Sequence, residues 1–208
     1  ALAVLTGLAG AYPIPLGPKV KVSLATAPTF VAVLLLPPAL AATAVGLGMA
    51  TSQVVLKWRW PHILLNSAMT VLCVGGAGLA YAAVNPTGAL FFSWPTGLAG
   101  TALAAATIYL VNRIVVAGVA SIQTGKNQFR LWQREWKQDA IQDLALFSLG
   151  FAGALAYHLT PWALAFLALA VVIAHKAFAR VMVPSSSKPA AVSDRARALV
   201  AGSGSRHP

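Results

Sequence analysis

Six polar side chains interrupt the long apolar stretches of this sequence, and they carry most of its potential for chemistry. They are Asn66, Asn112, Arg113, Asp139, Gln142 and Asp143. Polar groups inside apolar membrane helices are costly and commonly functional. Arg113 and Asp143 are predicted to form an ion pair, because pairing offsets the cost of burying both charges. The cluster is expected to be either a clasp between two helices or a polar site for a ligand or a proton.

The same residues lack the companions that catalysis or metal binding requires. Asp139 and Asp143 are four residues apart and share one helix face, but no nucleophile accompanies them. The histidines lack the spacing of metal ligands, and Cys73 is the single cysteine. The sequence therefore predicts a protein that is not an enzyme and holds no metal or other cofactor. A haem or pigment ligand at His62 or His175 is an open alternative.

A second pattern lies between residues 125 and 138. At helical spacing it has an aromatic stripe of Phe129, Trp132 and Trp136, and a basic stripe of Lys126, Arg130, Arg134 and Lys137. A helix of this kind lies in the headgroup plane, with its basic residues toward anionic lipids. The pattern predicts an amphipathic helix over about residues 125–138 that anchors the chain at the membrane surface. The alternative is a docking surface for a cytoplasmic partner.

The composition explains why these patterns belong to a bilayer. Of the 208 residues, 58% are hydrophobic and 9% are charged, against roughly 25% charged in an ordinary soluble domain. A soluble globule and a disordered chain are both excluded. The formal net charge of +11 comes from basic residues between apolar runs, which the positive-inside rule explains better than a nucleic-acid partner does. We therefore expect a multi-pass membrane protein whose basic loops face the cytoplasm.

The apolar segments predict an all-α bundle of transmembrane helices. Segments 63–84, 97–120, 140–159 and 162–183 meet the length of about 20 residues that a span needs. The uncharged segment 22–56 would be about 52 Å long as one helix. Pro37-Pro38 near its centre breaks a helix, so two short helices are expected over 22–36 and 39–56. With residues 1–16 the predicted number of spans is seven.

Charges between the spans predict the orientation of the bundle. Lys57 and Arg59 mark one cytoplasmic loop, and the basic stripe marks another. In a six-span alternative, Pro37-Pro38 only kinks one tilted helix. Both arrangements place the C-terminus in the cytoplasm. The expected organisation is a membrane domain over 1–183 and a mostly disordered cytoplasmic tail over 184–208.

Several loose motifs occur in an order that resembles a known family. They are Pro13-Ile-Pro-Leu-Gly-Pro-Lys-Val-Lys-Val-Ser, Leu34-Leu-Leu-Pro-Pro-Ala-Leu-Ala-Ala, Tyr109-Leu-Val-Asn-Arg113 and the tryptophan-rich stretch that follows. Over residues 1–180 the chain looks like the membrane-embedded N-terminal region of bacterial cyclic di-GMP signalling proteins with HD-GYP or GGDEF output domains. The resemblance implies a bacterial cytoplasmic (inner) membrane as the location. The sequence departs from that family after residue 183, so no catalytic output domain is expected. The proline break is also similar to substrate-binding subunits of energy-coupling vitamin transporters.

Three functions are compatible with these observations. The first is a non-catalytic, membrane-embedded sensing or ligand-binding module. The second is an accessory subunit packed inside a larger membrane complex of the energy-transducing type, and the third is a small-solute transport subunit. The expected partners are a bilayer with anionic lipids and a protein, either a cytoplasmic output protein or the larger complex.

Overall fold

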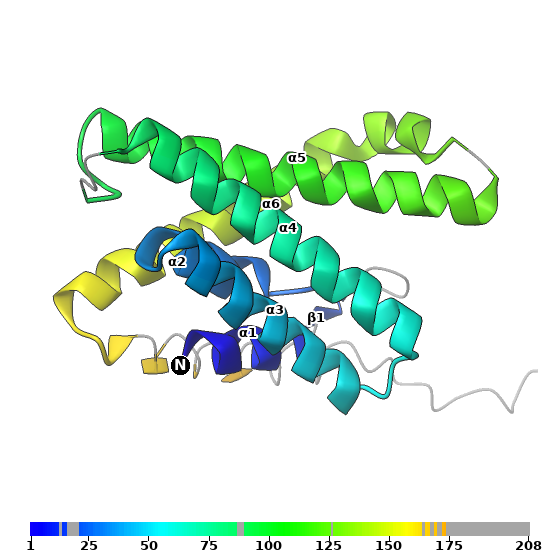
Figure 1. Ribbon diagram of the computed structural model, residues 1–208, viewed down its shortest axis with the longest axis horizontal. Coiled ribbons are helices and arrows are strands. Elements are labelled where there is room, and N and C mark those ends of the chain that lie inside the picture. Colours follow the sequence, from blue (N-terminus) through cyan, green and yellow to red (C-terminus); the bar gives the residue numbers. More distant parts are fainter. Residues whose placement is uncertain are drawn as a thin grey trace, which may run out of the picture.

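The computed structural model describes residues 1–12, 14–15, 21–86, 90–125, 127–163, 165–166, 169 and 172–173. Its elements are α1 (Leu2–Ala11), β1 (Ile14–Pro15), β2 (Lys21–Val22), α2 (Thr26–Leu35), α3 (Pro38–Val55), α4 (Trp60–Val84), α5 (Thr96–Thr124) and α6 (Gln128–Leu159) (Figure 1). The two short strands pair antiparallel, with Ile14 opposite Val22. Four stretches are long and apolar enough to cross a membrane: α3, α4, α5 and the part of α6 from Ala140 to Leu159.

The double proline separates α2 from α3, as the sequence predicts. The chain after α2 is extended at Leu36, with ψ 151°. Pro37 is the N-cap of α3 and Pro38 occupies its first turn, where a missing N–H leaves no hydrogen bond unmade. The predicted break is therefore confirmed, and the alternative of one kinked helix is wrong.

The first two helices are shorter than predicted. α1 and α2 have 10 residues each, so each is about 15 Å long. That length is half of a hydrocarbon core of about 30 Å, and the predicted count of seven spans is not confirmed. The predicted span 162–183 lies mostly outside the described residues, and the tail 184–208 lies wholly outside them.

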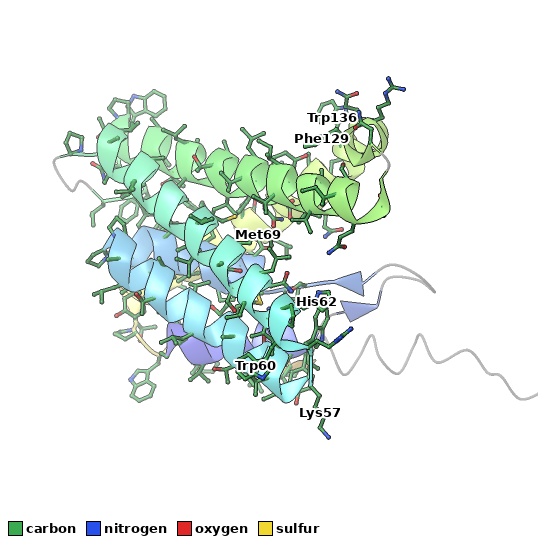
Figure 2. The ribbon with its side chains drawn as sticks, turned by 45° about the vertical axis from the view of Figure 1, so that its right-hand side comes forward. Lys57, Trp60, His62, Met69, Phe129 and Trp136 are labelled. Carbon is green, nitrogen blue, oxygen red and sulfur yellow. The ribbon has the colours of Figure 1, made fainter. Side chains whose placement is uncertain are left out.

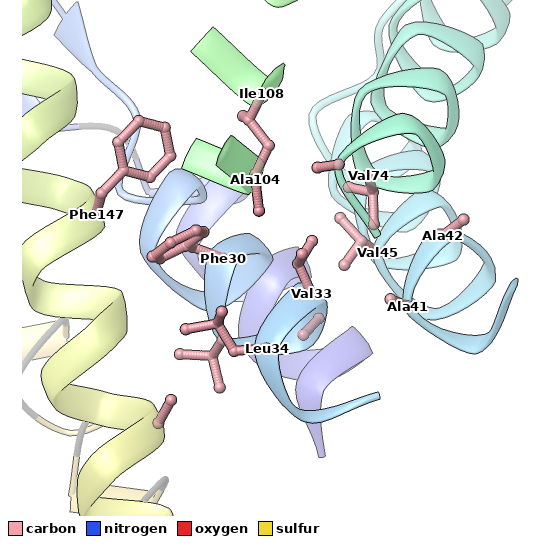
Figure 3. Packing of buried hydrophobic residues seen from close by; sticks show 14 of the residues in the cluster. Phe30, Val33, Leu34, Ala41, Ala42, Val45, Val74, Ala104, Ile108 and Phe147 are labelled. Carbon is pink, nitrogen blue, oxygen red and sulfur yellow. The ribbon is translucent and has the colours of Figure 1, made fainter. Parts of the chain in front are cut away.

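α2 is almost entirely enclosed by the other helices. Every residue from Ala27 to Leu34 is buried, as befits a helix that is apolar all round. Phe30 of α2 packs against Phe147 of α6 with ring centroids 5.0 Å apart. The same buried cluster includes core residues of the long helices, namely Ala41, Ala42 and Val45 of α3, Val74 of α4, and Ala104 and Ile108 of α5 (Figure 3). The long helices thus pack around α2.

Small residues set the positions of α1 and α2 at two close crossings. A Cβ added to Gly48 of α3 would overlap the backbone of Ala3 in α1. A Cβ added to Gly150 of α6 would lie 2.7 Å from the carbonyl oxygen of Ala27 in α2. Glycine at these points lets the helix backbones approach more closely than any side chain would allow.

The stretch predicted as an amphipathic helix at the membrane surface is the beginning of α6. Gly125 ends α5 in the left-handed conformation, with φ 65°, and the Asn127 side chain caps α6 by accepting a hydrogen bond from the Phe129 N–H at 3.1 Å. From Gln128 the helix continues to Leu159. The predicted amphipathic stretch and the predicted span 140–159 therefore lie on one continuous helix, because the sequence has no Gly or Pro between Gln128 and Gly150 to interrupt it.

Candidate functional site

A cavity of about 190 Å³, called the inner cavity below, lies between α2, α3, α4 and α5. Its wall includes hydroxyl groups, one carboxamide and one thiol, from Ser23, Thr26, Thr29, Thr70, Asn112 and Cys73. Methionine and aliphatic side chains form the rest of the wall. A mostly apolar cavity with a few convergent polar groups is the usual form of a small-molecule site.

The first turn of α2 lies at the inner cavity. Cys73 and Asn112 lie near the midpoints of α4 and α5, and the cavity at this level also receives Thr26 from the first turn of α2. The preceding residues stay irregular, and the Ala25 N–H donates to Ser23 Oγ at 3.3 Å. Helix N-termini carry partial positive charge. The inner cavity therefore combines a helix N-terminus with neutral hydrogen-bonding side chains.

Asn66 is one turn away from the inner cavity and joins α4 to α3. Its Nδ2 donates to Gln53 Oε1 at 3.2 Å, and the Asn66 carbonyl accepts from Thr70 Oγ1 at 2.8 Å. Gln53 is 5% exposed, and the sequence reasoning missed it. It is the single carboxamide in the uncharged segment 22–56, which is the signal that could have identified it.

Arg113 and Asp143 form the predicted ion pair between α5 and α6. Arg113 Nη2 lies 3.0 Å from Asp143 Oδ2, and the two side chains are 22% and 13% exposed. The guanidinium also lies over the Tyr109 ring, 5.6 Å from its centroid. The Tyr109 hydroxyl donates to the Trp136 carbonyl at 3.5 Å. These interactions clasp α5 to the first half of α6.

Among the described side chains, the predicted polar residues take part in more than one helix contact. Asn112 faces the inner cavity, whereas the neighbouring Arg113 faces α6. The physical reason is that successive residues of a helix with 3.6 residues per turn point about 100° apart. Gln142 is half-buried on α6, and the side chain of Asp139 lies outside the described residues.

The predicted membrane-surface anchor is described only in part. Phe129 is half-buried, Arg130 is exposed and Trp136 is 48% exposed near the start of α6 (Figure 2). Lys126 and the side chains of Trp132, Arg134 and Lys137 lie outside the described residues. Anchoring at the surface stays a prediction.

No protein-family model, curated protein or solved structure matches this chain. Within the described part of the chain, no group of three or more His, Cys, Asp or Glu residues could hold a metal ion. The helices themselves define the class: four of them are long and apolar enough to span a bilayer. The chain is a multi-pass helical membrane protein.

Proposed function

We propose that the chain is a non-catalytic membrane module that binds a small, uncharged polar ligand in the inner cavity and senses its presence. The observation that carries the proposal is the cavity wall, where hydroxyl groups of α2, of α4 and of Ser23 converge with the Asn112 carboxamide among apolar side chains. The described lining contains no charged side chain, which favours an uncharged ligand with both hydrogen-bond donors and acceptors.

The size of the cavity narrows the ligand class. A volume of about 190 Å³ corresponds to roughly six water molecules at about 30 Å³ each. Ligand pockets for larger molecules run from about 300 to 1,000 Å³. A small solute is therefore favoured over a nucleotide, a haem or another large cofactor.

α2 offers a physical connection between the ligand and the rest of the bundle. Thr26 and Thr29 line the cavity, and Phe30 of the same helix packs against Phe147 of α6. A ligand that shifts α2 changes the packing of α6. This connection supports a sensory role. The partner that we propose for it is a cytoplasmic output protein, and the proposed location is an inner membrane rich in anionic lipids.

Thermal unfolding of the full chain in mild detergent tests ligand binding. The probes are small neutral amides, polyols and nucleobases, and a solute at about 100 times its Kd should stabilise the fold by about 2.7 kcal/mol. Thr70→Val and Asn112→Leu should remove the stabilisation. Thr107→Val is the matched control, because Thr107 and Thr70 both donate to a carbonyl four residues earlier at 2.8 Å. Equal loss in the control, or no stabilising solute, would contradict the proposal.

An accessory subunit of a larger membrane complex is the second candidate. A groove of about 300 Å³ between α1 and α3 is lined by small residues such as Ala3, Gly7 and Gly48, which suit close helix packing. Leu47 on this groove is 62% exposed. Leu47→Trp should abolish co-purification of a membrane partner, whereas Leu64→Trp, at a site 64% exposed on α4, should not. A transport subunit, the third candidate, would use the inner cavity and move the same solute across sealed vesicles.

A further inference from the structure

A second cavity, called the α4–α5 groove below, has a volume of about 210 Å³. Its polar lining comes from Trp58, His62, Asn66 and Gln123, and valines of α5 form much of its apolar wall. The α4–α5 groove begins beside the start of α4, where His62 lies, and reaches Met69 further along the helix (Figure 2).

The α4–α5 groove and the inner cavity follow one another along the same seam. On α4 the lining runs through His62, Leu65, Asn66, Met69, Thr70 and Cys73. On α5 it runs through Gln123, Val119, Val116, Val115, Asn112 and Ile108. Both series have the spacing of three or four residues that places side chains on one helix face. Met69 lines both cavities, so it stands at the boundary between them.

We infer that the α4–α5 groove is a lateral access route to the inner cavity and that Met69 is the side chain that closes it. The inference rests on the proposed function, because the route serves the ligand of the inner cavity. Met69 is half-buried, and methionine has an unbranched side chain with three rotatable bonds. A rotamer change can therefore open the boundary while the helix backbones stay in place.

At the outer end of the route, a backbone hydrogen bond and a ring contact fix the position of Trp58. Lys57 adopts the left-handed conformation with φ 56°, which lets the Trp58 N–H donate to the Gln53 carbonyl at 3.0 Å. The Trp58 ring meets His62 edge-on, with centroids 6.1 Å apart. An indole, an imidazole and two carboxamides suit a ligand that partitions into the membrane interface before it moves inward.

The single cysteine supplies a reporter for access. Cys73 lines the inner cavity and is 5% exposed, so the rate of its modification by methyl methanethiosulfonate, a small neutral reagent, measures access to the cavity. The full chain is treated in lipid nanodiscs and the rate is read by intact mass spectrometry. Met69→Ala should accelerate modification about tenfold, the equivalent of about 1.4 kcal/mol.

A plug in the α4–α5 groove tests the route independently of Met69. Ala120→Trp places an indole in the α4–α5 groove and should slow modification about tenfold, alone and combined with Met69→Ala. Leu8→Trp, in the groove between α1 and α3, is the control and should leave the rate unchanged. If Met69→Ala does not fold, the comparison of Ala120→Trp with Leu8→Trp decides the question.

The competing route lies beside Ser23, which lines the inner cavity and is exposed. Slower modification in Ser23→Trp together with an unchanged rate in Ala120→Trp would overturn the inference. The outcome is separable from that of the proposed function. Cys73 modification requires no bound solute, and stabilisation by a solute requires no particular route.

Discussion

α2 and α5 differ sharply in length and in how much of each helix is buried within the protein. α2 has 10 residues, and eight consecutive ones are buried. α5 has 29 residues, and only 17% of its most apolar stretch of 18 residues is buried within the protein. Exposed leucine, isoleucine and valine side chains along α5 include Leu110, Ile114 and Val116. The short helix therefore makes its contacts with protein, while the long one offers much of its surface to lipid.

The two helices also differ in charge. The sequence of α2 has no charged residue, whereas α5 carries Arg113. A charge on α2 would lie at the centre of the bundle, but Arg113 lies at the α5–α6 seam with Asp143. In this pair the short helix is enclosed by protein, and the spanning helix carries the ionic contact with α6. Length alone does not decide enclosure, because α1 also has 10 residues and its Val4 is 65% exposed.

The largest expected effect comes from truncating an aromatic ring of α2. Phe30→Ala should destabilise the protein by about 3 kcal/mol, because it leaves a void beside Phe147. Leu110→Ala on α5, at a site 46% exposed, should cost less than about 1 kcal/mol. Equilibrium unfolding in mixed detergent micelles measures both. Similar costs at the two sites would break the distinction between the enclosed and the lipid-facing helix.

Removal of either partner of the ion pair should have the next largest effect. Arg113→Ala and Asp143→Ala should each cost about 2 kcal/mol, less than the 3–5 kcal/mol of a fully buried pair. The double mutant should lose less than the sum of the two single losses, because residues in contact are coupled. Arg130→Ala, at an exposed site on α6, is the control. Additive losses would show that the two groups do not interact in the membrane protein.

Replacement of two glycines by alanine should change the stability of the protein in opposite directions, one where α6 meets α2 and one on α5. Gly150→Ala should destabilise by about 1–2 kcal/mol, because its Cβ would press on the Ala27 carbonyl of α2. Gly118→Ala on α5 has open space within 4 Å and should stabilise by up to about 1 kcal/mol through helix propensity. Thermal unfolding of the two variants provides the measurement. Stabilisation by Gly150→Ala would mean that α6 does not approach α2 closely.

Part of the site could be predicted because it depends on simple rules. A charged residue in an apolar segment needs a partner of opposite sign, and that rule paired Arg113 with Asp143 before the fold was known. The inner cavity could not be predicted in this way. Thr26, Thr29 and Thr70 are ordinary helix residues whose hydroxyl groups are usually satisfied by the carbonyl four residues earlier. Their importance comes from the first turn of α2 lying level with the midpoints of α4 and α5, which no local pattern encodes.

The sequence by itself determined that this protein lies in a bilayer and that a helix break falls at Pro37-Pro38. Its composition requires a bilayer, and Pro37-Pro38 requires a helix break because proline lacks an N–H and clashes with the preceding turn. Only the tertiary structure decided that α2 covers half of a hydrocarbon core and that the long helices enclose it. Helix ends depend on close packing, here of Gly150 against Ala27, and close packing depends on residues far apart in the chain.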